Sequence, residues 1–202
     1  MEAALRTLAD LWVPANVIVA EGTATTFPES VAAVFSREPV AAMVMEGDFV
    51  PGVVAETSAA EIGVDVDVFA FPGESASDRF VVGGGDAAVL MLDTVGGQEL
   101  VRFLASPEAA STWAELGGFV SPNQALDLAV YPDATTRRIA RSLLEAGEGF
   151  RFDLSDLQPA AFGGTTDAGM WAELGRFAAD PTDVEGTMTR LEDAAQAAWA
   201  SD

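Results

Sequence analysis

The chain has 202 residues, half of them apolar, which is enough to bury a substantial core in one or two domains. It carries 32 acidic and 10 basic residues, and the resulting net charge of -22 argues against binding to nucleic acid or to anionic membranes. It contains no His and no Cys, which excludes a Ser-His-Asp triad, a His general base and nearly all zinc sites.

Hydrophobic periodicity predicts alternating strands and helices. Apolar residues at helical spacing predict a helix around 5–12 and a second helix that begins at Pro28. Short apolar or alternating runs predict strands at 40–45 and 64–71 and an extended region at 80–92. Further helices are predicted around 100–104, 109–116, 139–144, 170–178 and 184–198. This order predicts an α/β fold.

Six short motifs follow one another along the chain. They are an A-A-M run followed by Gly47 and an aromatic residue, a strand that ends in Phe-Pro, a glycine run, an F-L-x-S-P-E-A helix pair, a Gly-Gly segment that ends in Ser-Pro-Asn, and a late helix with a Trp. They occupy residues 38–49, 68–73, 83–86, 100–109, 117–123 and 166–174. In this order they resemble the C-terminal half of the family 1 extracellular solute-binding proteins, the maltose-binding-protein type.

The resemblance implies a periplasmic-binding-protein-like fold of type II. Residues 1–85 and 123–202 would form the C-terminal lobe, and residues 86–122 would cross into the first lobe. The implied partners are a sugar ligand and the membrane permease subunits of an ABC importer, with neither cofactor nor metal. The implied location is extracellular, either membrane-tethered or periplasmic, although no targeting signal is recognisable in this chain. Because the family is about twice as long, the chain is expected to be a fragment that lacks most of the first lobe.

The resemblance also implies the site residues. Sugar sites combine aromatic rings, which cover the apolar face of the sugar, with polar groups that bind its hydroxyls. Phe49, which follows a Gly-Asp turn, and Trp171 are expected to stack on the sugar, and Asp86 to accept its hydroxyls. The backbones at Gly85 and Gly164 are expected to approach the ligand closely. Ordinary turn, loop or core roles remain alternatives for each of these residues, while Trp12, Trp113 and Trp199 are expected in the core.

Two other classes of function remain open from the residues alone. A carboxylate-based glycosidase would need two flanking carboxylates, for which Asp153 and Asp156 are the candidates. An acidic scaffold or interaction module would have neither a cleft nor sugar-linked stabilisation. The glycine run at 83–85 lacks the G-x-G-x-x-G and P-loop patterns of nucleotide sites.

The fragment interpretation leads to two further expectations. A single lobe offers only half of the ligand contacts, so sugar affinity should be on the order of millimolar or weaker. The apolar residues 89–92 should lie on an unpaired strand edge, which predicts a homodimer or strand exchange between copies.

Overall fold

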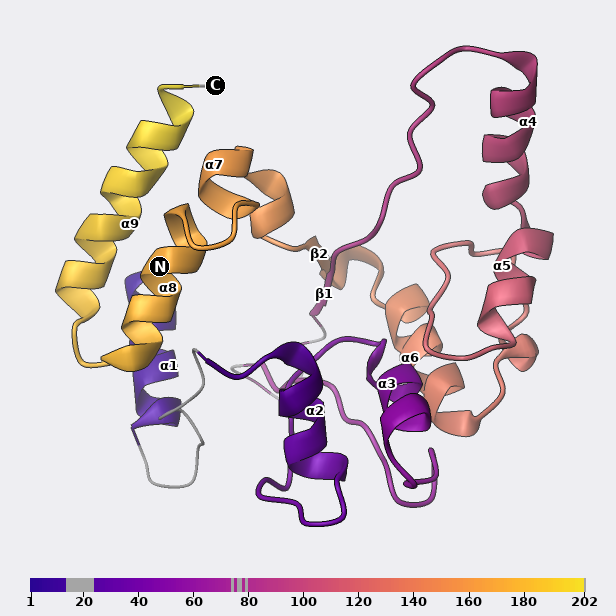
Figure 1. The fold of residues 1–202 in the computed structure, drawn as a ribbon, viewed down its shortest axis with the longest axis horizontal. Helices are drawn as coiled ribbons and strands as arrows, with labels where there is room; N and C mark the ends of the chain where they lie inside the picture. Colours follow the sequence, from indigo (N-terminus) through magenta and orange to yellow (C-terminus); the bar gives the residue numbers. More distant parts are fainter. Residues whose placement is uncertain (14–23, 74, 76–77, 79, 202) are drawn as a thin grey trace. The chain divides into compact units, whose positions relative to one another are not determined.

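A computed structural model describes residues 1–202 apart from 14–23, 74, 76–77, 79 and 202 (Figure 1). The chain forms two compact units, one made of Met1–Thr26 with Phe152–Asp202 and the other of Phe27–Arg151. We call them the terminal unit and the central unit. Among the residues described, helices predominate, and a single two-stranded sheet is present.

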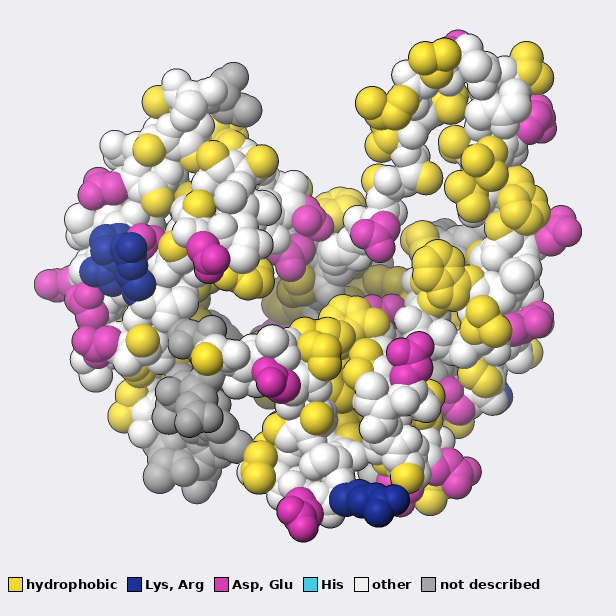
Figure 2. Space-filling model, in the orientation of Figure 1, with side chains coloured by type: hydrophobic (Ala, Val, Ile, Leu, Met, Phe, Trp, Pro, Cys, Tyr) yellow, Lys and Arg dark blue, Asp and Glu magenta, His cyan; other side chains and the backbone are white. Residues whose placement is uncertain are grey.

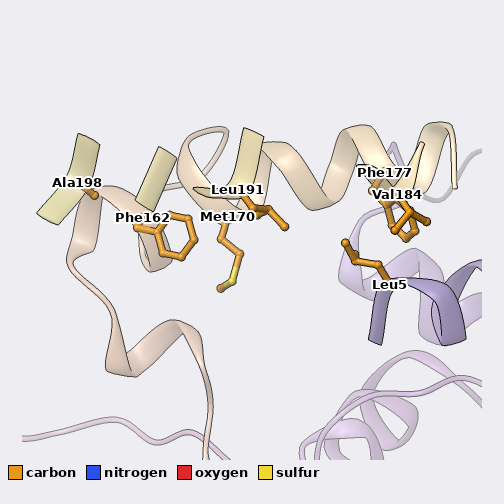
Figure 3. Close-up of a cluster of buried hydrophobic side chains, with 7 residues drawn as sticks. All are labelled: Leu5, Phe162, Met170, Phe177, Val184, Leu191 and Ala198. Carbon is orange, nitrogen blue, oxygen red and sulfur yellow. The ribbon is translucent and has the colours of Figure 1, made fainter. Parts of the chain in front are cut away.

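The terminal unit is helical. It contains α1 (Glu2–Trp12), α7 (Ala160–Gly163), α8 (Gly169–Ala179) and α9 (Val184–Trp199). Helices α1, α7 and α8 all contact α9, and Figure 3 shows Leu5 of α1 pointing toward Phe177 and Val184. The buried cluster consists of Leu5, Phe162, Met170, Phe177, Val184, Leu191 and Ala198. These apolar residues recur at helical spacing, so burying one face of each helix stabilises the unit.

The central unit has two small cores. Helices α2 (Phe27–Phe35) and α3 (Val50–Thr57) pack together around Val31, Val54 and Val66. Helices α5 (Pro107–Ala114) and α6 (Ala134–Glu145) contribute to a second cluster around Tyr131. The unit also holds α4 (Val95–Leu104) and β1 (Val81–Gly83), which pairs with β2 (Phe150–Phe152). All of β2 except its last residue belongs to this unit.

The predicted helices are confirmed, and their starts follow from capping chemistry. The side chains of Thr94, Ser106 and Asp133 accept hydrogen bonds from the amides of Gly97, Ala109 and Thr136, which begins α4, α5 and α6. Helix α3 was not predicted from the sequence. Proline is well suited to the first turn of a helix, and Pro51 occupies that position.

The predicted strands are mostly absent from the described residues. Residues 40–45 form no strand, residues 64–71 contribute only a bridge between Ile62 and Val66, and the extended region 80–92 contains only β1. A strand needs a partner for its backbone and cover for its apolar face. Val40, Met43 and Met45 are 70–73% exposed, so this run has no such cover.

The division into a C-terminal lobe (1–85 and 123–202) and a crossing segment (86–122) stays a prediction. The bounds of the two compact units differ from these ranges. Within the predicted crossing segment 86–122, α4 has no buried residue, and Leu100 and Leu104 are exposed. Figure 2 shows hydrophobic side chains gathered over α4 and the segment that precedes it.

No helix of the described residues is both long enough and apolar enough to cross a membrane.

Candidate ligand-binding site

Phe49 lies on the surface of the central unit, in the turn that leads into α3. Its side chain is 43% exposed, and its ring meets that of Phe27 edge to face, with 5.0 Å between the ring centroids. Gly47 makes this arrangement possible, because a Cβ there would lie 2.6 Å from the Phe49 ring. The ring therefore folds back over a glycine and stays accessible on part of its surface.

Asp48, the neighbour of Phe49, is a carboxylate that sequence reasoning missed. It is partly buried, and its Oδ2 accepts a hydrogen bond of 3.1 Å from the backbone N–H of Val120. Burial disfavours the charged form and raises the pKa of Asp48, although hydrogen bonds from its own amide and that of Val120 oppose the rise. Nearby, the backbones of Gly52 and Gly118 approach so closely that a Cβ on Gly118 would lie 2.9 Å from the Cα of Gly52. These contacts join the start of α3 to the segment 117–123.

The segment 117–123 is itself held at several points. Gly117 and Gly118 adopt φ values of 78° and 68°, which favour glycine. The buried hydroxyl of Tyr131 accepts a hydrogen bond from the Ser121 amide, and the Asn123 side chain donates to the carbonyl of Ala105. Asp48 therefore contacts a segment with a defined conformation.

Trp113 and Trp199 were predicted to lie in the core, and this prediction is wrong. Trp113 is 59% exposed and stacks on Phe119 at 4.5 Å, and Trp199 is 60% exposed near the end of α9. The indole rings project from apolar helices whose buried positions are filled by smaller residues such as Ala114 and Ala198. Trp12 is only partly exposed and packs against the terminal core, 5.9 Å from Phe177.

Gly85 and Asp86 follow β1 in an irregular, exposed segment. A Cβ on Gly85 would meet no atom within 4 Å, so space does not require glycine there. No hydrogen bond joins the Asp86 carboxylate to another residue of the described chain. Both residues are accessible to a ligand, but the protein does not fix the orientation of the Asp86 side chain.

Trp171 and Gly164 belong to the terminal unit. Trp171 is 61% exposed on α8, whereas Met170 and Glu173 of the same helix are buried. Gly164 is exposed directly after α7. The five predicted site residues thus divide between the two units, with Phe49, Gly85 and Asp86 in the central one. That they line one cleft stays a prediction.

Asp153, one of the two candidate glycosidase residues, has a local structural role. Asp153 accepts hydrogen bonds from both the hydroxyl and the amide of Ser155, and these bonds lower its pKa. A lowered pKa is the opposite of what a general acid requires.

A hollow of about 410 Å³ lies in the terminal unit, between α1 and the turn before α9. Its lining includes Arg6, Asp10 and Thr182 but none of the predicted site residues.

Comparisons with known proteins find two binding proteins that are similar to this chain. It is 34% identical over 169 residues to an osmoprotective compounds-binding protein, GgtB, from Synechocystis sp., an alignment that covers 82% of this chain and 38% of the relative. It is 28% identical over 160 residues to an alpha-glucosides-binding periplasmic protein, AglE, from Rhizobium meliloti, with coverage of 75% and 34%. The chain matches solute-binding proteins of sugar and osmoprotectant ABC transporters.

The resemblance to these solute-binding proteins is therefore confirmed over most of the chain. The chain spans between a third and two-fifths of the length of these two relatives. No family model matches it, and no solved structure matches it significantly. Both relatives are named for the compounds that they bind, not for a reaction.

Proposed function

We propose that this chain forms part of the substrate-binding component of an ABC importer, which binds a sugar or oligosaccharide outside the cell membrane. The observation that carries the proposal is the similarity of the chain, over four-fifths of its length, to a protein named for binding osmoprotective compounds. The chain is also similar to a protein named for binding alpha-glucosides. In this role the chain delivers ligand to membrane permease subunits in the extracellular or periplasmic space and catalyses no reaction.

The proposed contacts follow the chemistry of a sugar ring. Phe49 and Trp171 expose aromatic surface to solvent, and covering this surface with the apolar face of a sugar is favourable. The carboxylate of Asp86 would accept sugar hydroxyls, and the backbones at Gly85 and Gly164 would approach the ligand without the obstruction of a side chain.

A ligand panel tests the proposal. Maltose, trehalose and sucrose represent alpha-glucosides, cellobiose is a beta-linked control, and glycine betaine is an osmolyte without a sugar ring. Titrations followed by chemical-shift changes in NMR spectra detect affinities as weak as the order of millimolar expected for half of a cleft. Saturable binding of at least one alpha-glucoside, with weaker binding of cellobiose, supports the proposal. No saturable binding of any sugar, by either this chain or a longer product of its gene, contradicts it.

We also propose that copies of the chain associate through residues 89–92. Val89, Met91 and Leu92 are 71–88% exposed, so contact with a second copy would remove apolar surface from water. The segment is irregular, and association would therefore rest on its side chains or on strand formation when two copies meet. Sedimentation velocity at increasing concentration should reveal a dimer that Met91→Asp weakens. A wild-type chain that stays monomeric would contradict this proposal.

A further inference from the structure

The turn that carries Phe49 also presents a second group able to bind a sugar. Phe49 is held between the edge-to-face contact with Phe27 and the glycine at position 47, which together fix the direction of its ring. Asp48 is the preceding residue, and its carboxylate is fixed by the Val120 amide. An aromatic ring and an anchored carboxylate thus occupy neighbouring positions in one turn.

The fold alone does not require an acid at position 48. The contact with Val120 needs one neutral acceptor, which an Asn side chain would also provide. Partial burial instead makes the charged form of Asp48 less favourable than it is in water, as its raised pKa reflects. No Arg pairs with Asp48 among the described residues. A carboxylate kept in such surroundings requires a different explanation from that of a solvated surface charge.

Binding to a ligand supplies that explanation. Sugar hydroxyls donate hydrogen bonds, and bonds to a charged acceptor are stronger than those to a neutral one. A side chain that is already held by the protein loses less conformational freedom on binding than a free one. Asp48 meets this condition, whereas the Asp86 side chain extends into solvent from an irregular segment.

We propose that Asp48 is the carboxylate that binds sugar hydroxyls beside Phe49 and contributes to selection of the ligand. This inference rests on the proposed sugar-binding function, and it adds a residue to the site that the sequence motifs did not identify. Asp48 and Phe49 then bind the sugar together. The ring covers the apolar face of the sugar, and the carboxylate accepts hydrogen bonds from the hydroxyls at its rim.

The test compares four variants of the full chain by NMR titration with the alpha-glucoside that binds most tightly. Asp48→Asn keeps an acceptor for Val120 but removes the charge, and its dissociation constant is expected to rise roughly tenfold. Phe49→Ala reports on the proposed stacking, and Asp86→Asn on the alternative carboxylate. Asp127→Asn is the matched control, because Asp127 also accepts a backbone hydrogen bond, 2.9 Å from Ala129, and is exposed in the same unit.

A second measurement separates ligand contact from folding. Its ligands are methyl alpha-glucoside and analogues of it that each lack one hydroxyl. The wild type is expected to bind at least one of these analogues more weakly than methyl alpha-glucoside itself, and Asp48→Asn is expected to lose this discrimination. A residue with a structural role alone would leave the discrimination unchanged.

The outcomes distinguish this inference from the proposed function. If Phe49→Ala weakens binding but Asp48→Asn does not, the assignment of Asp48 is wrong and the sugar-binding function stands. If the wild type binds no sugar, both fall. Equal losses in Asp48→Asn and Asp127→Asn would show a general effect of charge and would overturn the assignment.

Discussion

At the scale of single residues, Trp171 allows binding to be separated from folding. Its ring is 61% exposed, so little of it contributes to the core of the terminal unit. Trp171→Ala should change the free energy of unfolding by about 0.5 kcal/mol or less, as is usual for surface positions. It should weaken sugar binding by about 1–3 kcal/mol if the ring stacks on the ligand. Urea denaturation and ligand titration of the same variant measure the two effects.

Phe177 provides the contrast on the same helix. Its side chain is fully buried in the terminal core, and Phe177→Ala should lower the free energy of unfolding by about 3–5 kcal/mol. A stability loss in Trp171→Ala as large as that in Phe177→Ala would contradict a surface role for Trp171.

Asp48 predicts a pH dependence with an unusual sign for a carboxyl group. Burial raises its pKa above the ordinary value of 3.8, so the folded chain holds the proton more tightly than the unfolded chain does. The stabilising contribution of the protonated group is complete below this ordinary value and is lost as the pH rises through the pKa of the folded state. The stability of Asp48→Asn relative to the wild type should therefore increase from about pH 3.8 toward neutrality.

Thermal unfolding at several pH values between 3 and 7 measures this difference. Asp127→Asn serves as the reference, because Asp127 is exposed. A wild type that gains stability over Asp48→Asn as the pH rises would show that burial does not dominate at this residue.

At the scale of elements, a polar network joins α8 to α9. Glu173, which is 8% exposed, accepts hydrogen bonds from Arg176 at 2.7 Å and from Arg190 at 2.8 Å. Arg190 also donates to Asp183 and Thr187, and its contact lowers the pKa of Asp183. Asp183 in turn caps α9 through the amide of Gly186. The network thus fixes the turn between the two helices.

Removing Glu173 should therefore be costly. Glu173→Ala leaves Arg190 without one of its two carboxylate partners, and the free energy of unfolding should fall by roughly 1.5–3 kcal/mol. Glu2→Ala removes an exposed ion pair with Arg6 on α1 and should change the free energy of unfolding by about 0.5 kcal/mol or less. Chemical denaturation of both variants measures the difference. Equal effects would show that burial adds nothing to the α8–α9 network.

Helices were predictable from sequence where local chemistry determines them. The spacing of Leu5 and Leu8, or of Val184, Met188 and Leu191, indicates a helix whatever else the chain does. The strands depend on partners that are distant in sequence, so an apolar run such as 40–45 could not be assigned from its own residues. The same limit applies to Asp48, because the backbone amide that donates a hydrogen bond to it belongs to Val120, which lies 72 residues away.

At the scale of the whole molecule, acidic residues exceed basic ones by 22, the magnitude of the net charge of -22. The ion pairs of the described residues involve few of these carboxylates. Most of these pairs lie on the surface, where a single pair contributes little to the free energy of unfolding. Repulsion among the remaining acidic side chains therefore opposes the compact state. The chain also exposes much apolar surface around α4, so the packing that resists this repulsion is limited.

Salt should accordingly stabilise the fold. Raising the ionic strength from 0.01 M to 0.15 M shortens the screening length from about 30 Å to about 8 Å, which weakens repulsion between distant carboxylates more than attraction within close pairs. The midpoint of thermal unfolding should rise over this range at neutral pH. Sodium chloride and potassium chloride should act equally if screening is the cause, whereas sucrose at the same osmolality should produce a smaller rise unless it binds as a ligand. A midpoint that falls with salt would show that attractive ion pairs, such as those of Arg190, outweigh the net repulsion.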